Sequence, residues 1–186
     1  LTLRPRSKDF RDHGHTLADH KPNVLLAFFG FNESFAGEHG LPKFEADLAA
    51  FLQTPQGIDQ FTSARSQWDR TADKDVDLAK LDKLRQIVLV TPLAHENLND
   101  LSLPDGTARN KELKLYADAM KRIAAKHQAP VVDLFEASLA LMQTAGDKKL
   151  TINGVHLNEH GDALIGAALD EARVAAAPER SPKVDL

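Results

Sequence analysis

Residues 24–30 read VLLAFFG, an apolar run of strand length that ends on a glycine. Two further runs of this kind follow, IVLV at residues 87–90 and VVDL at residues 131–134. Runs this short and this apolar are typical of strands buried on both faces of a sheet. Because segments with helical periodicity separate them, the sequence predicts an α/β protein whose parallel sheet is covered by helices on both sides.

Three amphipathic patterns predict the covering helices. Apolar residues recur at helical spacing over residues 44–52, where Pro42 suits the first turn, and again over residues 113–124. The last pattern covers residues 165–172. Asn158 precedes it and is the expected N-cap, since asparagine accepts a hydrogen bond from a free backbone N–H at a helix start.

The chain has 186 residues, of which 42% are hydrophobic and 27% charged, as expected of a globular domain. We expect one domain over residues 1–177, followed by a flexible tail at 178–186. Layered α/β sheets typically hold about five strands. The predicted sheet therefore lacks one or two strands on its N-terminal side, where residues 10–20 have only a helix-like pattern. The polar stretch at residues 53–77 predicts a long loop.

Composition excludes several classes of function. A net charge of -4 and a pI near 6.1 predict no nucleic-acid partner, because binding phosphates requires a basic face. No apolar run approaches the ~20 residues of a membrane helix, and the absence of cysteine removes thiolate metal sites. Four possible metal ligands lie near the N-terminus, but Gly14 interrupts their pattern, so we predict no metal: Asp12, His13, His15 and His20. Composition does not define an oligomeric state.

The loops after the strands hold the candidate chemistry, because ligands bind at the carboxyl ends of parallel strands. In the first loop, Gly30 lets the backbone turn and Phe31-Asn32-Glu33 follow. The neutral amide of Asn32 is suited to hold a developing oxyanion. The alternative is that Asn32 closes a turn through its own backbone.

Further candidates come from the two later loops. His156, just before the last helix, is a candidate general base; a half-buried histidine that fills space is the alternative. His95 and Glu96 follow the second strand, on the expected rim of the site. His95 is a candidate substrate contact, and an exposed polar loop pair is the alternative. We expect the substrate to be bound by Gly30, Phe31, Glu33 and His95.

Three strings of the sequence together resemble the SGNH hydrolases (GDSL-type lipases and esterases), in a bacterial branch. They are FGFNESFAG at residues 29–37, NKELKLY at 110–116 and NGVHLN at 153–158. The resemblance implies a flavodoxin-like α/β/α sandwich with five parallel strands and hydrolysis of a carboxylic ester or acetylated carbohydrate. It also implies that Asn32 is the oxyanion-hole amide and His156 the catalytic base. No cofactor is implied, and relatives are often exported.

Two features depart from the family pattern. The family's Gly-Asp-Ser nucleophile and its oxyanion-hole glycine belong to strands before the first run, and neither motif is visible here, so we expect the nucleophile in a segment that this chain lacks. Ser34 and Ser102 do not follow a strand in a tight turn. Asn153 stands where the family usually has aspartate, and it either orients His156 or makes the turn before Gly154. A catalytically silent binding module of the same fold is the alternative function.

Overall fold

The computed structural model describes residues 24–53 and 86–176. The candidate metal ligands, the predicted segment at 10–20, most of the polar stretch at 53–77 and the tail at 178–186 lie outside them. The strands are β1 (Val24–Phe28), β2 (Gln86–Val90) and β3 (Val131–Val132). The helices are η1 (Glu33–Ala36), η2 (Glu38–Gly40), α3 (Leu41–Gln53), α5 (Thr107–Lys126), α6 (Leu134–Thr144) and α7 (Glu159–Ala176).

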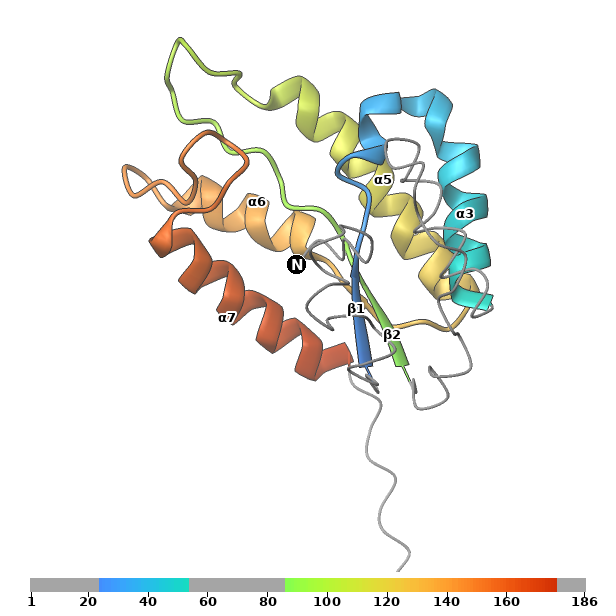
Figure 1. Cartoon of the computed structure of the whole chain (residues 1–186). Coiled ribbons are helices and arrows are strands. Elements are labelled where there is room, and N and C mark those ends of the chain that lie inside the picture. Colours follow the sequence, from blue (N-terminus) through green and yellow to red (C-terminus); the bar gives the residue numbers. More distant parts are fainter. Residues whose placement is uncertain (1–23, 54–85, 177–186) are drawn as a thin grey trace, which may run out of the picture.

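The three strands form a parallel sheet in the order β1-β2-β3. Val24 pairs with Gln86 at one end of the register and Phe28 with Val90 at the other, so β1 and β2 run the same way over their whole length. Helices α3 and α5 lie on one side of the sheet and α6 and α7 on the other (Figure 1). This confirms the predicted α/β class with helices on both faces.

Alternating side chains of the strands build two cores, one on each face. Leu25, Ala27 and Leu89 are buried against α3 and α5, together with Phe44, Leu48 and Tyr116. Val88, Val90 and Val132 are buried on the opposite face, against α6 and α7. Since strand side chains alternate between faces, both faces must be apolar for a central strand, which is why these runs are continuously hydrophobic.

The three predicted helical patterns lie within α3, α5 and α7, but the predicted extent of the third strand is wrong. The run at residues 131–134 was expected to be one strand, but β3 ends at Val132. Asp133 is the N-cap of α6, and its side chain accepts a hydrogen bond from the Glu136 N–H, which turns the chain into a helix. Helix α6 itself was not predicted, although the aspartate followed three residues later by glutamate indicates a helix start.

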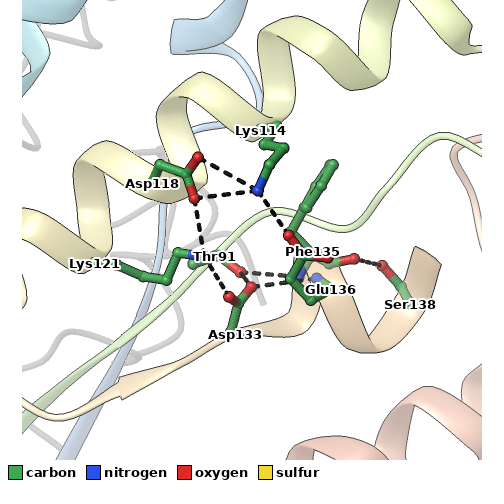
Figure 2. A network of polar contacts seen from close by, with 8 residues as sticks. All are labelled: Thr91, Lys114, Asp118, Lys121, Asp133, Phe135, Glu136 and Ser138. Atoms are coloured by element: carbon green, nitrogen blue, oxygen red, sulfur yellow. Dashed lines mark hydrogen bonds and ion pairs between the residues drawn. The ribbon is translucent and has the colours of Figure 1, made fainter. Parts of the chain in front are cut away.

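Asp133 is also the centre of a polar network that joins β2, α5 and α6 (Figure 2). Its Oδ1 accepts from the Thr91 hydroxyl at 3.1 Å, and its Oδ2 accepts from Lys121 Nζ at 2.7 Å. Thr91 Oγ1 in turn accepts from the Phe135 N–H at 2.9 Å. One carboxylate therefore sets the position of α6 relative to the end of β2.

Asp133→Ala should lower the free energy of unfolding by about 1–2 kcal/mol, since it removes a helix cap and leaves Thr91 and Lys121 without this partner. Chemical denaturation followed by circular dichroism measures the change. Asp147→Ala, at an exposed turn, is the matched control and should stay within about 0.5 kcal/mol of the parent. Equal stability of the two variants would contradict the role assigned to Asp133.

Asp118 should make the stability depend on acid pH. Partial burial opposes its ionisation, but hydrogen bonding and charge from Lys121, with the charge of Lys114, outweigh burial and lower the Asp118 pKa. A lowered folded-state pKa contributes stability that is present above about pH 4 and lost as the pH falls further. Asp118→Asn should therefore weaken the acid destabilisation by at most about 1 kcal/mol, whereas Asp147→Asn should not. Parallel pH profiles of unfolding for Asp118→Asn and the parent chain would count against this.

Candidate active site

The first loop turns sharply at Gly30. Its φ of 94° is in the left-handed region, and a Cβ there would lie 3.2 Å from Pro92 Cδ, so a side chain is disfavoured on both counts. The Gly30 N–H donates to Glu33 Oε2 at 2.9 Å, and the Ser34 N–H donates to the Gly30 carbonyl at 3.1 Å. Glu33 thus holds the loop closed, and the substrate contact expected of it stays a prediction.

Asn32 is exposed at the start of η1. Its backbone is helical, with φ of -72° and ψ of -37°, and its side chain makes no capping hydrogen bond. Glu33, rather than the Asn32 side chain, closes the turn at Gly30. The amide of Asn32 is therefore not used as the cap of η1 and lies at the surface of the loop.

Arg109, from the first turn of α5, secures this loop from the side. It donates to the Phe31 carbonyl at 2.6 Å, and that carbonyl also accepts from the Ser34 hydroxyl at 2.6 Å. The guanidinium lies 3.6 Å from the centre of the Phe35 ring, whose side chain is 68% exposed. Phe31 is half-buried and packs against the core on the α6 and α7 side, so its role includes support of the loop.

The loop before α7 brings Asn153 and His156 into contact. Asn153 Oδ1 accepts from the Val155 N–H at 3.2 Å and from the His156 N–H at 2.9 Å. The same oxygen lies 3.1 Å from Nδ1 of the His156 ring. Of the two interpretations of Asn153, orientation of the histidine and formation of the turn, the geometry supports both at once.

This contact also selects the tautomer of His156. An atom that receives two backbone N–H groups is the amide oxygen, because the amide nitrogen is only a donor. A hydrogen bond to that oxygen requires the proton on Nδ1, which leaves the lone pair on Nε2 in the neutral ring. Since His156 is exposed, Nε2 is the atom available for proton transfer.

Glu96 is the buried residue that carries this loop. It is 2% exposed, and its oxygens accept from the Leu150 N–H at 3.0 Å, the Thr151 N–H at 2.7 Å and the Thr151 hydroxyl at 2.7 Å. The interpretation of His95 and Glu96 as an exposed loop pair is wrong, because both are buried. Sequence reasoning placed Glu96 on the rim and missed its contacts 54 and 55 residues away.

His95 is buried as well, at 8% exposure, and its Nδ1 has no hydrogen-bond partner among the described residues. Cβ atoms on Gly106 or Gly154 would collide with its ring, so both glycines are needed for the loops to close over it. Asn110 holds the His95 backbone, accepting from its N–H at 2.7 Å and donating to its carbonyl at 2.8 Å. The substrate contact expected of His95 stays a prediction.

The three loops lie at the same end of the sheet, beyond the carboxyl ends of the strands (Figure 1). Gly30 of the first loop lies next to Pro92 of the second, since a Cβ placed on Gly30 would be 3.2 Å from Pro92 Cδ. The second and third loops are joined by a hydrogen bond from the Glu96 N–H to the Gly154 carbonyl, at 2.9 Å. The candidate amide and the candidate base therefore belong to one connected set of loops, as expected of a parallel sheet.

The serines of the described residues are engaged elsewhere. Ser34 and Ser138 are fully buried, and both donate to backbone carbonyls. The Ser102 hydroxyl donates to Asp100 within its own turn at 2.7 Å. In residues 24–53 and 86–176, no group of three histidine or carboxylate side chains suits a metal ion, and no helix is long and apolar enough to cross a membrane.

Asn153→Ala should release the His156 ring from its single tautomer, because the only side-chain acceptor described at Nδ1 is removed. Long-range proton–nitrogen NMR spectra of the imidazole distinguish the two tautomers directly. We expect Nδ1–H in the parent chain and a mixture in the variant. Asn97→Ala, in another exposed loop, should leave the His156 signals unchanged, and a parent ring protonated on Nε2 alone would refute the assignment.

Comparison with known proteins identifies the fold. No family model matches the chain, and no curated protein matches its sequence significantly. Among solved structures, an acetyl xylan esterase superimposes with a TM-score of 0.51 at 21% identity, over 88% of this chain and 71% of its own. The acetylxylan esterase from Geobacillus stearothermophilus gives 0.54 at 18% identity, over 93% and 70%. A lipase/acylhydrolase from Enterococcus faecalis gives 0.51 at 18%, over 92% and 72%.

These likenesses cover about nine-tenths of the chain. The chain spans 66% to 72% of the length of such structures. Its parallel sheet, with helices on both faces, agrees with the flavodoxin-like sandwich that the motifs predicted. The chain therefore has the α/β fold of the SGNH-type (GDSL-like) ester hydrolases.

Proposed function

We propose that this chain is part of a serine-dependent ester hydrolase in which His156 is the general base and Asn32 an oxyanion donor. The observation that carries the proposal is the contact between Asn153 Oδ1 and His156 Nδ1, at 3.1 Å. It leaves Nε2 as the basic atom on an exposed loop at the carboxyl end of the sheet. The Asn32 amide is exposed on another loop at the same end. A base and a neutral donor at one end of the sheet suit acyl transfer.

In the proposed reaction, a serine hydroxyl attacks the carbonyl carbon of the ester and its proton passes to His156 Nε2. The carbonyl oxygen becomes an oxyanion, which accepts a hydrogen bond from the Asn32 amide. When the intermediate collapses, the leaving alcohol takes the proton from His156 and the acyl group stays on the serine. Water then repeats the sequence and releases the acid, which restores the serine.

The nucleophile in this proposal comes from a segment outside residues 1–186. The sequence contains no Gly-Asp-Ser, and the hydroxyl of each described serine donates a hydrogen bond to a residue two or three positions earlier in the chain. In the described sheet, β1 pairs with β2 on one side only. A further strand that carries such a motif would pair with the other side of β1. The same segment would supply the second oxyanion donor, which the family takes from a glycine.

Asn153 stands where a full triad has a charged carboxylate. Its amide oxygen orients the imidazole but brings no negative charge to stabilise the imidazolium. The proposal is therefore a serine–histidine pair oriented by an amide. For the substrate, we propose a short acyl ester, with acetylated carbohydrates favoured because two of the three structures compared above are named acetyl xylan esterases.

The test is ester hydrolysis by the chain joined to the Gly-Asp-Ser segment that the proposal requires. p-Nitrophenyl acetate and an acetylated xylo-oligosaccharide are the substrates, and residues 1–186 alone are expected to be inert. His156→Ala should lower kcat by about 10²- to 10⁴-fold because proton transfer is lost. Asn32→Ala should lower it by about 10²- to 10³-fold because one oxyanion donor is lost.

His160→Ala is the matched control, because His160 is an exposed histidine four residues away, in the first turn of α7. It should keep the parent activity. Full activity of His156→Ala would exclude His156 as the base. A folded, joined protein that cleaves neither substrate would favour the alternative, a catalytically silent binding module.

A further inference from the structure

We propose that Glu96 is a positioning residue for His156, acting through the turn at residues 151–154. The proposal rests on the function proposed above, in which His156 is the base. Glu96 is 2% exposed, belongs to the loop after β2, and directs its carboxylate hydrogen bonds to Leu150 and Thr151. It acts on His156 through two intermediate residues, Thr151 and Asn153.

The first link is the carboxylate of Glu96. Its Oε2 accepts from both the N–H and the hydroxyl of Thr151, each at 2.7 Å, and from the Leu150 N–H at 3.0 Å. A buried carboxylate without such donors would be strongly destabilising, so these contacts are held firmly. They fix where the chain enters the turn.

The second link is the Thr151 hydroxyl. Because it donates its proton to Glu96, its lone pairs are free to accept, and it accepts from the Gly154 N–H at 3.0 Å. The Glu96 N–H donates to the Gly154 carbonyl at 2.9 Å. Thr151 and Gly154 are therefore both tied to Glu96, and Asn153 lies between them.

The third link is the contact already described between Asn153 Oδ1 and His156 Nδ1. A shift of the turn would move this oxygen relative to the ring and remove the preference for one tautomer. Glu96 is itself fixed, since Asn110 of α5 holds the backbone of the preceding residue with two hydrogen bonds. The position of the His156 ring therefore depends, through this chain of hydrogen bonds, on helix α5.

The experiment compares variants of the 186-residue chain by long-range proton–nitrogen NMR of His156. Glu96→Gln places an amide N–H₂ where backbone N–H groups point, and it should convert the single Nδ1–H tautomer into a mixture. Thr151→Val removes the relay hydroxyl and should have the same effect. Thr151→Ser keeps the hydroxyl and should retain the parent spectrum.

Loss of stability alone is controlled by Asp133→Ala, which weakens the fold at α6 without touching the turn. It should leave the His156 tautomer as in the parent chain. Parent-like His156 signals in both Glu96→Gln and Thr151→Val would overturn the positioning role. A mixed tautomer in Asp133→Ala would do so too, since the effect would then follow stability rather than the relay.

Activity of the joined protein is the second readout. Glu96→Gln should lower kcat on the order of 10²-fold with KM little changed, because a displaced base impairs proton transfer rather than substrate binding. An unchanged kcat would contradict the positioning role. If the parent protein cleaves no ester, the proposed function fails, while the NMR comparison still decides whether Glu96 positions the imidazole.

Discussion

The buried carboxylate of Glu96 is the interaction on which the candidate site depends. It joins the loop after β2 to the loop before α7, two segments 54 residues apart in the sequence. Removing a carboxylate from water is costly, and here the two N–H groups and one hydroxyl that face it offset that cost. Because all of these donors come from Leu150 and Thr151, the stabilisation is present only when the loop that carries His156 is closed.

A second polar anchor, the half-buried Asp133, lies after β3, next to the end of β2. Asp133 receives hydrogen bonds from Thr91 and Lys121 and caps α6 (Figure 2). The Ser138 hydroxyl of that helix then accepts from the Ala94 N–H at 2.9 Å, one residue before His95. The chain from Thr91 to Glu96 is thus held by α5 and α6 together.

The neutral partner of His156 separates orientation from charge. In a serine-protease triad an aspartate supplies both, and replacing it with asparagine lowers turnover by about 10⁴-fold, largely because the ring takes the wrong tautomer. Here the two backbone N–H groups from Val155 and His156 fix the amide of Asn153 with its oxygen toward the ring, which selects the tautomer protonated on Nδ1. Orientation is kept, and only the charge that would stabilise the imidazolium is missing.

Local patterns in the sequence were enough to predict the fold class and the helices α3, α5 and α7, and they singled out Asn32 and His156 as candidates. Apolar runs, helical spacing and the strings around Asn32 and His156 involve residues that are close together in the sequence. Such patterns can be recognised from the sequence of one chain. The burial of Glu96, the double role of Asn153 and the early end of β3 depended on the tertiary structure. Each arises from a polar group meeting a partner that folding brings to it, and the strength of such a contact is set by burial and geometry rather than by sequence spacing.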